Sequence, residues 1–295
     1  MADHAHHHHH HHSRSGNALK AAAALTIAFA LVEALGGWWT GSLALLSDAG
    51  HMLTDGAALI LGALAAWMAR LPPSGRHSYG LGRAEIIAAL VNAAAMLVII
   101  AALSYEAIAR LGQPGAVDGK AAAVIALAGL AINIAVMRWL APHGHDLNMR
   151  AARLHVAGDA LGSVAALISG GVIAFTGWTR ADPIASLLIC GLIAWSSVRL
   201  LRESLHALME GVPHGLSVES IGAEMASIGG VLSVHDLHVW TLSGSRTALS
   251  AHVIVRSMTH WDRTRGELQA RLHEKFGIDH VTLQPESGVQ PLIRH

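Results

Sequence analysis

Two segments of the chain each carry a histidine and an aspartate four residues apart. The first pair is His51 and Asp55, and the second is His155 and Asp159. On an α-helix this spacing places both side chains on one face, one turn apart. Two such helices facing each other would direct two imidazoles and two carboxylates toward one point. Two His and two Asp ligands form a tetrahedral nitrogen and oxygen site of the kind that suits Zn²⁺.

The charge of this quartet also fits a divalent cation. Two carboxylates balance the two positive charges of the ion, which lowers the cost of burying it. A single buried His–Asp pair fits a plain hydrogen bond equally well, but the same spacing in two separate segments favours metal binding. Asp48 lies one turn before His51 and is either a carboxylate on the access path or a helix-end charge. Glu33 is interpreted as a structural or interfacial group rather than a ligand.

Both pairs lie in apolar segments that are long enough to cross a membrane. Of the 295 residues, 53% are hydrophobic and 14% are charged, whereas soluble domains carry about 25% charged residues. A helix needs about 20 apolar residues to cross the hydrocarbon core, and charged groups inside such a helix are usually functional. Together these features predict an all-α membrane bundle of six helices within residues 18–206. The six segments are 18–38, 43–69, 84–111, 119–141, 149–176 and 183–206.

Positive charges in the short connections indicate how the bundle is oriented. The connection between the second and third segments carries Arg70, Arg76 and Arg83, whereas the turn at 40–42 carries no Lys or Arg. Because Lys and Arg stay in cytoplasmic loops, we expect a multi-pass protein of the cytoplasmic (inner) membrane, with both termini in the cytoplasm and lipid around the bundle. Residues 1–17 contain the run His6 to His12 and are expected to be disordered. This run is either native or an expression tag.

The pattern after the bundle predicts a small cytoplasmic α+β domain over residues 207–295. A helix at 217–228 ends at two glycines, and strands at 233–242 and 246–255 alternate apolar and polar residues across a short hairpin turn. An amphipathic helix follows at 260–276, and a last strand at 279–285. This order is the ferredoxin-like αββαβ arrangement.

Composition and motifs disfavour several other classes of protein. Twenty Lys and Arg balance twenty Asp and Glu, so a nucleic-acid partner, which needs a basic face, is not expected. The lone Cys190 excludes a cysteine-based zinc site and an intrachain disulfide framework. Neither a His-Glu-x-x-His metalloprotease motif nor a phosphate-binding Gly-x-x-x-x-Gly-Lys motif is present. We therefore predict no enzyme, and a transporter of this sequence would draw on an ion gradient.

The chain resembles the cation diffusion facilitator family from about Leu19 to Glu286. The resemblance is carried by short stretches that occur in the family's order, SLALLSDAGHMLTD at 42–55, YGLGRAE at 79–85, NMRAA at 148–152, HDLHVW at 235–240 and HVTLQ at 280–284. It implies a homodimeric exporter of divalent metal that exchanges metal for protons by alternating access. It also implies that the transport site is His51, Asp55, His155 and Asp159, with zinc preference because the first position is a histidine.

Ligand chemistry gives a reason for proton exchange at such a site. Metal binding requires neutral histidine and ionised aspartate, so metal and protons compete for the same groups. Two alternatives stay open. In the first, the protein is an exporter whose main cargo is Cd²⁺, Co²⁺ or Fe²⁺ instead of Zn²⁺. In the second, it is a membrane metal sensor or scaffold rather than a transporter.

The resemblance further implies regulatory zinc sites in the C-terminal domain at a dimer interface. The candidate ligands are His238, His252, His280 and Glu286, and His235 is an alternative from the same stretch as His238. Because His238 and His252 fall on two neighbouring strands, we expect them to face one another. The short connection between the fourth and fifth segments contains His143 and His145, which are either weak zinc-capturing groups or part of a plain polar turn.

Overall fold

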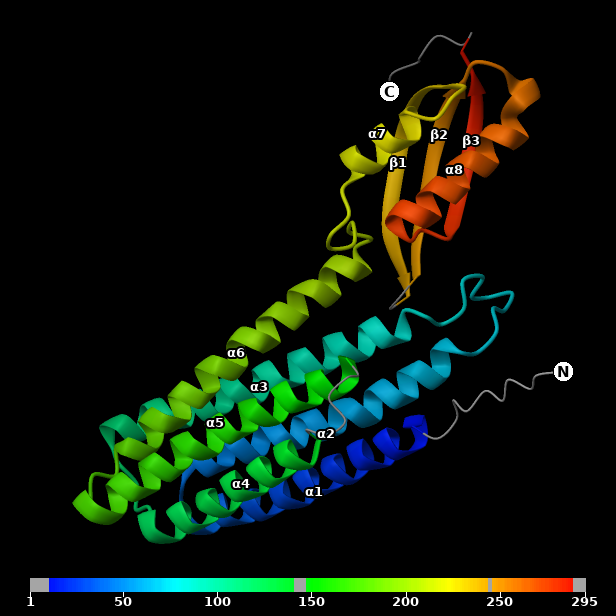
Figure 1. Ribbon diagram of the computed structural model, residues 1–295. Coiled ribbons are helices and arrows are strands. Elements are labelled where there is room, and N and C mark those ends of the chain that lie inside the picture. Colours follow the sequence, from blue (N-terminus) through cyan, green and yellow to red (C-terminus); the bar gives the residue numbers. More distant parts are fainter. Residues whose placement is uncertain (1–10, 141–146, 244–245, 289–295) are drawn as a thin grey trace, which may run out of the picture. The chain divides into compact units, whose positions relative to one another are not determined.

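Six long helices make up the first part of the computed structural model, which describes residues 11–140, 147–243 and 246–288 (Figure 1). They are α1 (His11–Thr40), α2 (Leu43–Ala69), α3 (Ala84–Gly112), α4 (Gly119–Leu140), α5 (Leu147–Thr176) and α6 (Ala181–Leu208). All six are long and apolar enough to cross a membrane, which confirms the predicted bundle. Helix α1 begins at His11, inside the segment expected to be disordered, although its apolar stretch begins at Ala21.

The chain divides into two compact units, each with its own interior. The first extends to Ile60 and includes Asn92–Arg199, and the second holds Leu61–Val91 and the chain from Leu200 onward. In the first unit α4 packs against both α1 and α5. Its core is rich in small residues, among them Ala44, Ala122 and Ala166. Small side chains let membrane helices approach closely, because packing rather than exclusion of water holds them together.

The start of α2 is capped by a carboxylate from α6. Asp182 is buried and accepts hydrogen bonds from the Ser42 hydroxyl (2.5 Å) and from the backbone N–H groups of Leu43 (2.6 Å) and Ala44 (3.3 Å). The first N–H groups of a helix have no partner within the helix, and a carboxylate there is favourable. The cap therefore sets where α2 begins, and with it the position of His51 about two turns further along.

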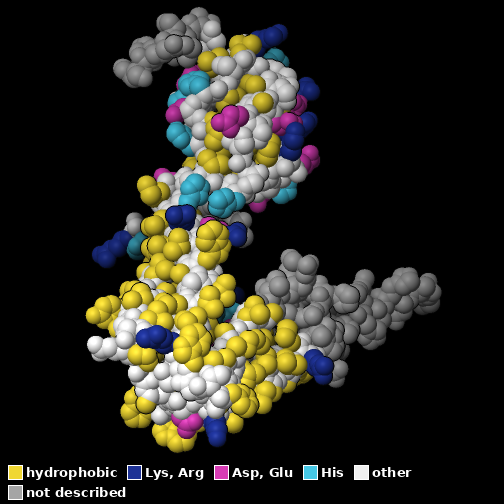
Figure 2. Space-filling view, turned by 90° about the vertical axis from the view of Figure 1, so that its left-hand side faces the viewer, with side chains coloured by type: hydrophobic (Ala, Val, Ile, Leu, Met, Phe, Trp, Pro, Cys, Tyr) yellow, Lys and Arg dark blue, Asp and Glu magenta, His cyan; other side chains and the backbone are white. Residues whose placement is uncertain are grey.

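Large apolar side chains cover the outside of the helices. Figure 2 shows hydrophobic side chains dominating the visible surface of the helical part of the chain. Exposed examples include Ile60, Val98, Phe175 and Trp195, and Phe175 is 92% exposed. An apolar exterior of this extent is a liability in water but matches a lipid environment. The surface thus agrees with six spans in a membrane.

The C-terminal domain contains two helices on a three-stranded sheet. The elements are α7 (Val218–Ala226), β1 (Val231–Ser243), β2 (Arg246–Val255), a 3₁₀ turn at Met258–His260, α8 (Trp261–Phe276) and β3 (His280–Ser287). The central strand β2 is antiparallel to β1 and parallel to β3. Ile221 and Met225 of α7 and Leu268 and Leu272 of α8 are buried in one core with the strands. The predicted αββαβ order is confirmed.

Candidate metal transport site

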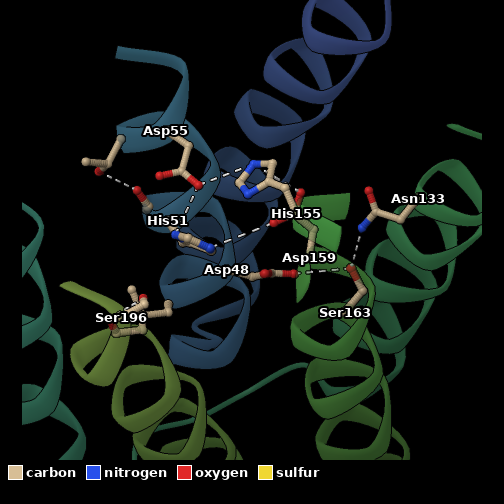
Figure 3. A network of polar contacts seen from close by, with 11 residues as sticks. Asp48, His51, Asp55, Asn133, His155, Asp159, Ser163 and Ser196 are labelled. Carbon is tan, nitrogen blue, oxygen red and sulfur yellow. Dashed lines mark hydrogen bonds and ion pairs between the residues drawn. The ribbon is translucent and has the colours of Figure 1, made fainter. Parts of the chain in front are cut away.

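The two His–Asp pairs of α2 and α5 meet inside the helical bundle. Figure 3 shows the side chains of His51 and Asp55 from α2 turned toward those of His155 and Asp159 from α5. His155 Nε2 lies 3.3 Å from Asp55 Oδ2 and 3.8 Å from Asp159 Oδ2. His51 Nδ1 lies 3.5 Å from Asp55 Oδ2, and His51 Nε2 lies 3.8 Å from Asp159 Oδ1. Helical spacing brings each pair together, and packing of α2 against α5 brings the pairs to one point.

These separations are of the size found between ligands of one metal ion. Nitrogen and oxygen ligands lie about 2.1 Å from Zn²⁺, so two tetrahedral ligands lie about 3.4 Å apart. Ligand atoms of His51, Asp55 and His155 all lie within 4.8 Å of one another. Asp159 is within 3.8 Å of both imidazoles. Three of the four side chains therefore already offer converging ligand atoms, and Asp159 lies beside both imidazoles, where it could complete the set.

The burial of the site leaves some of its polar atoms without hydrogen bonds. The Asp159 side chain is 0% exposed, and neither of its oxygens has a hydrogen-bond partner among the described residues. His51 Nδ1 is also a buried atom without a hydrogen-bond partner among the described residues. A buried carboxylate that accepts no hydrogen bond is costly, and a bound cation would lower that cost. The His155 side chain, by contrast, is 45% exposed.

A second layer of polar groups lies next to the quartet, on the side of the α1–α2 connection. Ser163 of α5 donates a hydrogen bond to Asp48 Oδ2 (3.2 Å), and Asn133 Nδ2 of α4 donates to Ser163 Oγ (3.3 Å) (Figure 3). Asp48 is therefore an interior group rather than an exposed helix-end charge, since it is 1% exposed. Asp48 was recognisable from the sequence but Ser163 was not, because a serine in a membrane helix has no spacing that marks it.

A separate cluster in the C-terminal domain joins all three strands. His252 Nδ1 of β2 lies 2.7 Å from Glu286 Oε1 of β3, and His235 Nε2 of β1 lies 3.0 Å from Glu286 Oε2. The two imidazole centroids are 5.2 Å apart. Hydrogen bonds from His252 and His235 hold the pKa of the Glu286 carboxyl below its usual range. This trio has the ligand types and the proximity of a candidate metal site.

The strand register differs from the expected one at His238. His235, not His238, lies opposite His252, and His238 pairs with Ser250. The register shifts between His235 and His238, where Asp236 adopts a left-handed backbone (φ 51°). Such a bulge changes which side chains share a face. His238 bonds instead to Asp236 (2.9 Å), which lowers the pKa of that carboxyl.

The remaining predicted ligands do not join this trio. His280 opens β3 opposite Ala248, whereas Glu286 lies opposite Ile254 near the other end of the strand. Asp236 was not predicted, although its Oδ2 lies 3.7 Å from His252 Nε2. Its position between His235 and His238 in the sequence could have marked it as a candidate ligand. His143 and His145 lie outside the described residues.

A bundle of apolar helices that brings together a quartet of cation ligands is the architecture of a transporter of metal cations. Comparison with known families agrees. The cation efflux transmembrane domain matches residues 19–209, and the cytoplasmic domain of cation efflux proteins matches residues 213–288. The chain belongs to the cation diffusion facilitator family.

Several relatives carry names that state their cargo. Zinc transporter ZitB of Escherichia coli is 44% identical over 89% of this chain and 84% of its own. A cadmium, cobalt and zinc/H⁺–K⁺ antiporter of Bacillus velezensis is 38% identical over 88% and 85%. The metal cation efflux protein CzcD of Cupriavidus metallidurans is 37% identical over 97% and 90%. The solved metal-bound C-terminal domain of CzcD is 32% identical and covers 24% of this chain and 99% of its own, with a TM-score of 0.23.

Proposed function

We propose that this protein exports Zn²⁺ across the cytoplasmic membrane in exchange for protons, by alternating access. The observation that carries the proposal is the convergence of two imidazoles and two carboxylates from α2 and α5, with four interatomic separations of 3.3–3.8 Å. The relatives named as zinc transporters and as proton antiporters support it. Zinc is the cargo of this site and not a resident cofactor.

The ligand chemistry couples the two fluxes. The quartet binds metal with its histidines neutral and its aspartates ionised, and it releases metal when protons compete. Histidine titrates near pH 6.5, within reach of the acidic side of an energised membrane. The two carboxylates also neutralise the divalent ion while it is away from water. Protons and zinc therefore alternate at one location.

The orientation and the assembly are also part of the proposal. Positive charge in the predicted cytoplasmic connections supports a multi-pass protein of the bacterial inner membrane with both termini in the cytoplasm. The match to the cytoplasmic domain of cation efflux proteins supports a homodimer. In this proposal His235, His252 and Glu286 form a regulatory zinc site near the dimer contact. His238 and His280 are not ligands of that site.

Transport of zinc into inverted vesicles or proteoliposomes, with and without a pH gradient, tests the proposal. We expect the gradient to drive zinc accumulation, and its collapse to abolish that accumulation. Zinc uptake that ignores the pH gradient would refute proton exchange. Competition by Cd²⁺, Co²⁺ and Fe²⁺ in the same assay ranks the cargoes, and the relative named for cadmium and cobalt makes those two the second candidates.

The same assay separates a transporter from a metal sensor. A sensor that reports metal through its C-terminal domain would keep its response to zinc after the quartet is removed. A transporter would lose zinc flux entirely. The variant His51→Ala with Asp55→Ala, measured for flux and for zinc binding by the C-terminal domain, distinguishes the two.

A further inference from the structure

Glu33 of α1 is a carboxylic acid enclosed in the bundle. The side chain is 0% exposed, and neither carboxylate oxygen has a hydrogen-bond partner among the described residues. Helix α4 leaves room for it, since a Cβ atom added at Gly129 would lie 2.6 Å from Glu33 Oε1. A buried carboxylate commonly pairs with a cationic side chain, but none of the described charged groups that act on Glu33 is cationic.

The two side chains whose charges act on Glu33 are both acidic. They are Asp48 from α2 and Asp159 from α5, while α4 contributes Gly129. Asp48 has its own enclosed position, because a Cβ atom added at Gly162 would lie 2.3 Å from Asp48 Oδ1. Two glycines on neighbouring helices thus leave space for two carboxylates. Three ionised carboxylates in such a place would repel one another strongly.

Protons relieve this repulsion when no metal is bound. A neutral Glu33 removes one of the three charges, and it also avoids the cost of burying an unpaired anion. A divalent cation at the quartet adds positive charge beside Asp159, which makes an ionised Glu33 far less costly. Metal and a proton on Glu33 therefore oppose each other through electrostatics, even though Glu33 is not a metal ligand.

We propose that Glu33 binds one proton when zinc leaves the quartet and releases it when zinc binds, as a proton site separate from the metal ligands. This inference rests on the proposed zinc–proton exchange and extends it to a residue of α1. The step is a simple transfer in which a carboxylate and a proton from water give a carboxylic acid. Asp48 and Ser163 lie on the side of the α1–α2 connection, which is the outer side in the predicted orientation, where protons would enter.

A second metal site is the competing interpretation of these acidic residues. Glu33, Asp48 and Asp159 do not form one of the described residue groups whose ligand atoms all lie within 4.8 Å of one another. A cation in that place would therefore lack the convergent oxygens that it needs. Protons need no such convergence, because one oxygen is enough to hold a proton.

The number of protons exchanged per zinc ion gives the most direct test. In proteoliposomes holding the full chain, with the membrane potential clamped at zero, the zinc gradient at zero net flux is measured over a series of imposed pH gradients. Each exchanged proton adds about a tenfold zinc gradient per pH unit. The slope of log zinc gradient against pH difference thus counts protons.

Glu33→Gln keeps the shape of the side chain and cannot ionise. We expect its slope to fall by about one relative to the wild type, which is about a tenfold smaller zinc gradient per pH unit. Glu33→Asp, which keeps an ionisable group, should retain the wild-type slope. Glu106→Gln is the matched control, because Glu106 is an exposed glutamate of α3 that pairs with Arg110 (2.8 Å). Its slope should not change.

An unchanged slope in a zinc-transporting Glu33→Gln protein would overturn the proposal and leave Glu33 with a structural role. If Glu33→Gln does not fold, Glu33→Met, which suits an apolar interior, replaces it under the same criterion. Failure of the proposed function looks different, because the wild type itself would then show no dependence on the pH gradient. Proton release on zinc binding in detergent, measured by calorimetry in buffers of different ionisation enthalpy, gives a second count and should also fall by about one proton per zinc.

Discussion

Asp55 of α2 and His155 of α5 face each other with Oδ2 and Nε2 only 3.3 Å apart, although a hundred positions separate them in the chain. Each is also close to the histidine or aspartate of its own helix. A cation held by these groups would link α2 to α5 directly. Loss of the cation, or protonation of the ligands, would release that link. Changes of occupancy at this point can therefore alter how the two helices pack.

Removing Asp159 should stop zinc transport. Asp159→Ala leaves a divalent ion with one carboxylate in a buried site, a penalty of about 3 kcal/mol or more. Zinc binding at the quartet should weaken by at least about a hundredfold, as measured by calorimetry on the purified protein. The bundle should stay folded, because the change also removes a buried carboxylate that accepts no hydrogen bond from the described residues.

Glu106→Ala provides the control for that experiment, since it removes an exposed carboxylate from another helix of the same bundle. Its zinc affinity and flux should match the wild type. Near-normal zinc flux in a well-folded Asp159→Ala dimer would show that the quartet is not the transport site.

Replacing His51 by aspartate should keep transport and loosen its selectivity. A third carboxylate changes the geometry and the charge that the site offers, which weakens the preference for zinc over cadmium. We expect the ratio of zinc to cadmium flux to fall on the order of tenfold, about 1.4 kcal/mol. Competition between the two ions in vesicles measures this ratio, and an identical ratio in His51→Asp would contradict the assigned role of His51.

The C-terminal domain should dimerise in a zinc-dependent way as residues 207–295. It has its own buried core, and its candidate metal ligands lie on the strands. His252→Ala should raise the zinc concentration needed for dimerisation at least about tenfold, whereas His260→Ala, an exposed histidine, should not. Light scattering at increasing zinc concentration measures the molar mass of the fragment. A wild-type fragment that stays monomeric at high zinc would remove the basis for an interfacial site.

The stability of the same domain should depend on pH through Glu224. Hydrogen bonds from Lys275 and then Arg271 of α8 lower the pKa of this carboxyl on α7. Because the pKa is lower in the folded state, the carboxylate stabilises the fold above its unfolded pKa of about 4.3, and this stabilisation is lost as the pH falls through the folded value.

Glu224→Gln should therefore unfold at slightly lower urea concentrations than the wild type at pH 7. The difference between the two proteins should shrink as the pH falls below about 4. Glu274→Gln on α8, for which the described residues offer no ion-pair partner, serves as the reference. A difference that is the same at pH 7 and pH 3 would mean that the contact contributes through shape rather than charge.

The membrane bundle and the order of the C-terminal elements were predictable from local patterns. Apolar runs of about 20 residues can satisfy their backbone groups only as helices in lipid, so the six spans follow from composition and length. The pairs His51–Asp55 and His155–Asp159 were recognisable because helical spacing alone puts each pair on one face. The glycines around 229 and 277 and the alternating strands likewise marked the α+β order.

Distances between helices and the register of the strands depended on the tertiary structure. The fully buried, unpaired state of Glu33 follows from how α1, α2, α4 and α5 pack, which no local spacing encodes. That His235 rather than His238 lies opposite His252 is set by the register of β1 against β2, which also shifts by one residue at a bulge between these two histidines. A strand has a period of two, so a single extra residue exchanges its faces. Local periodicity therefore determined which elements this chain forms, and long-range packing decided which of their polar side chains meet.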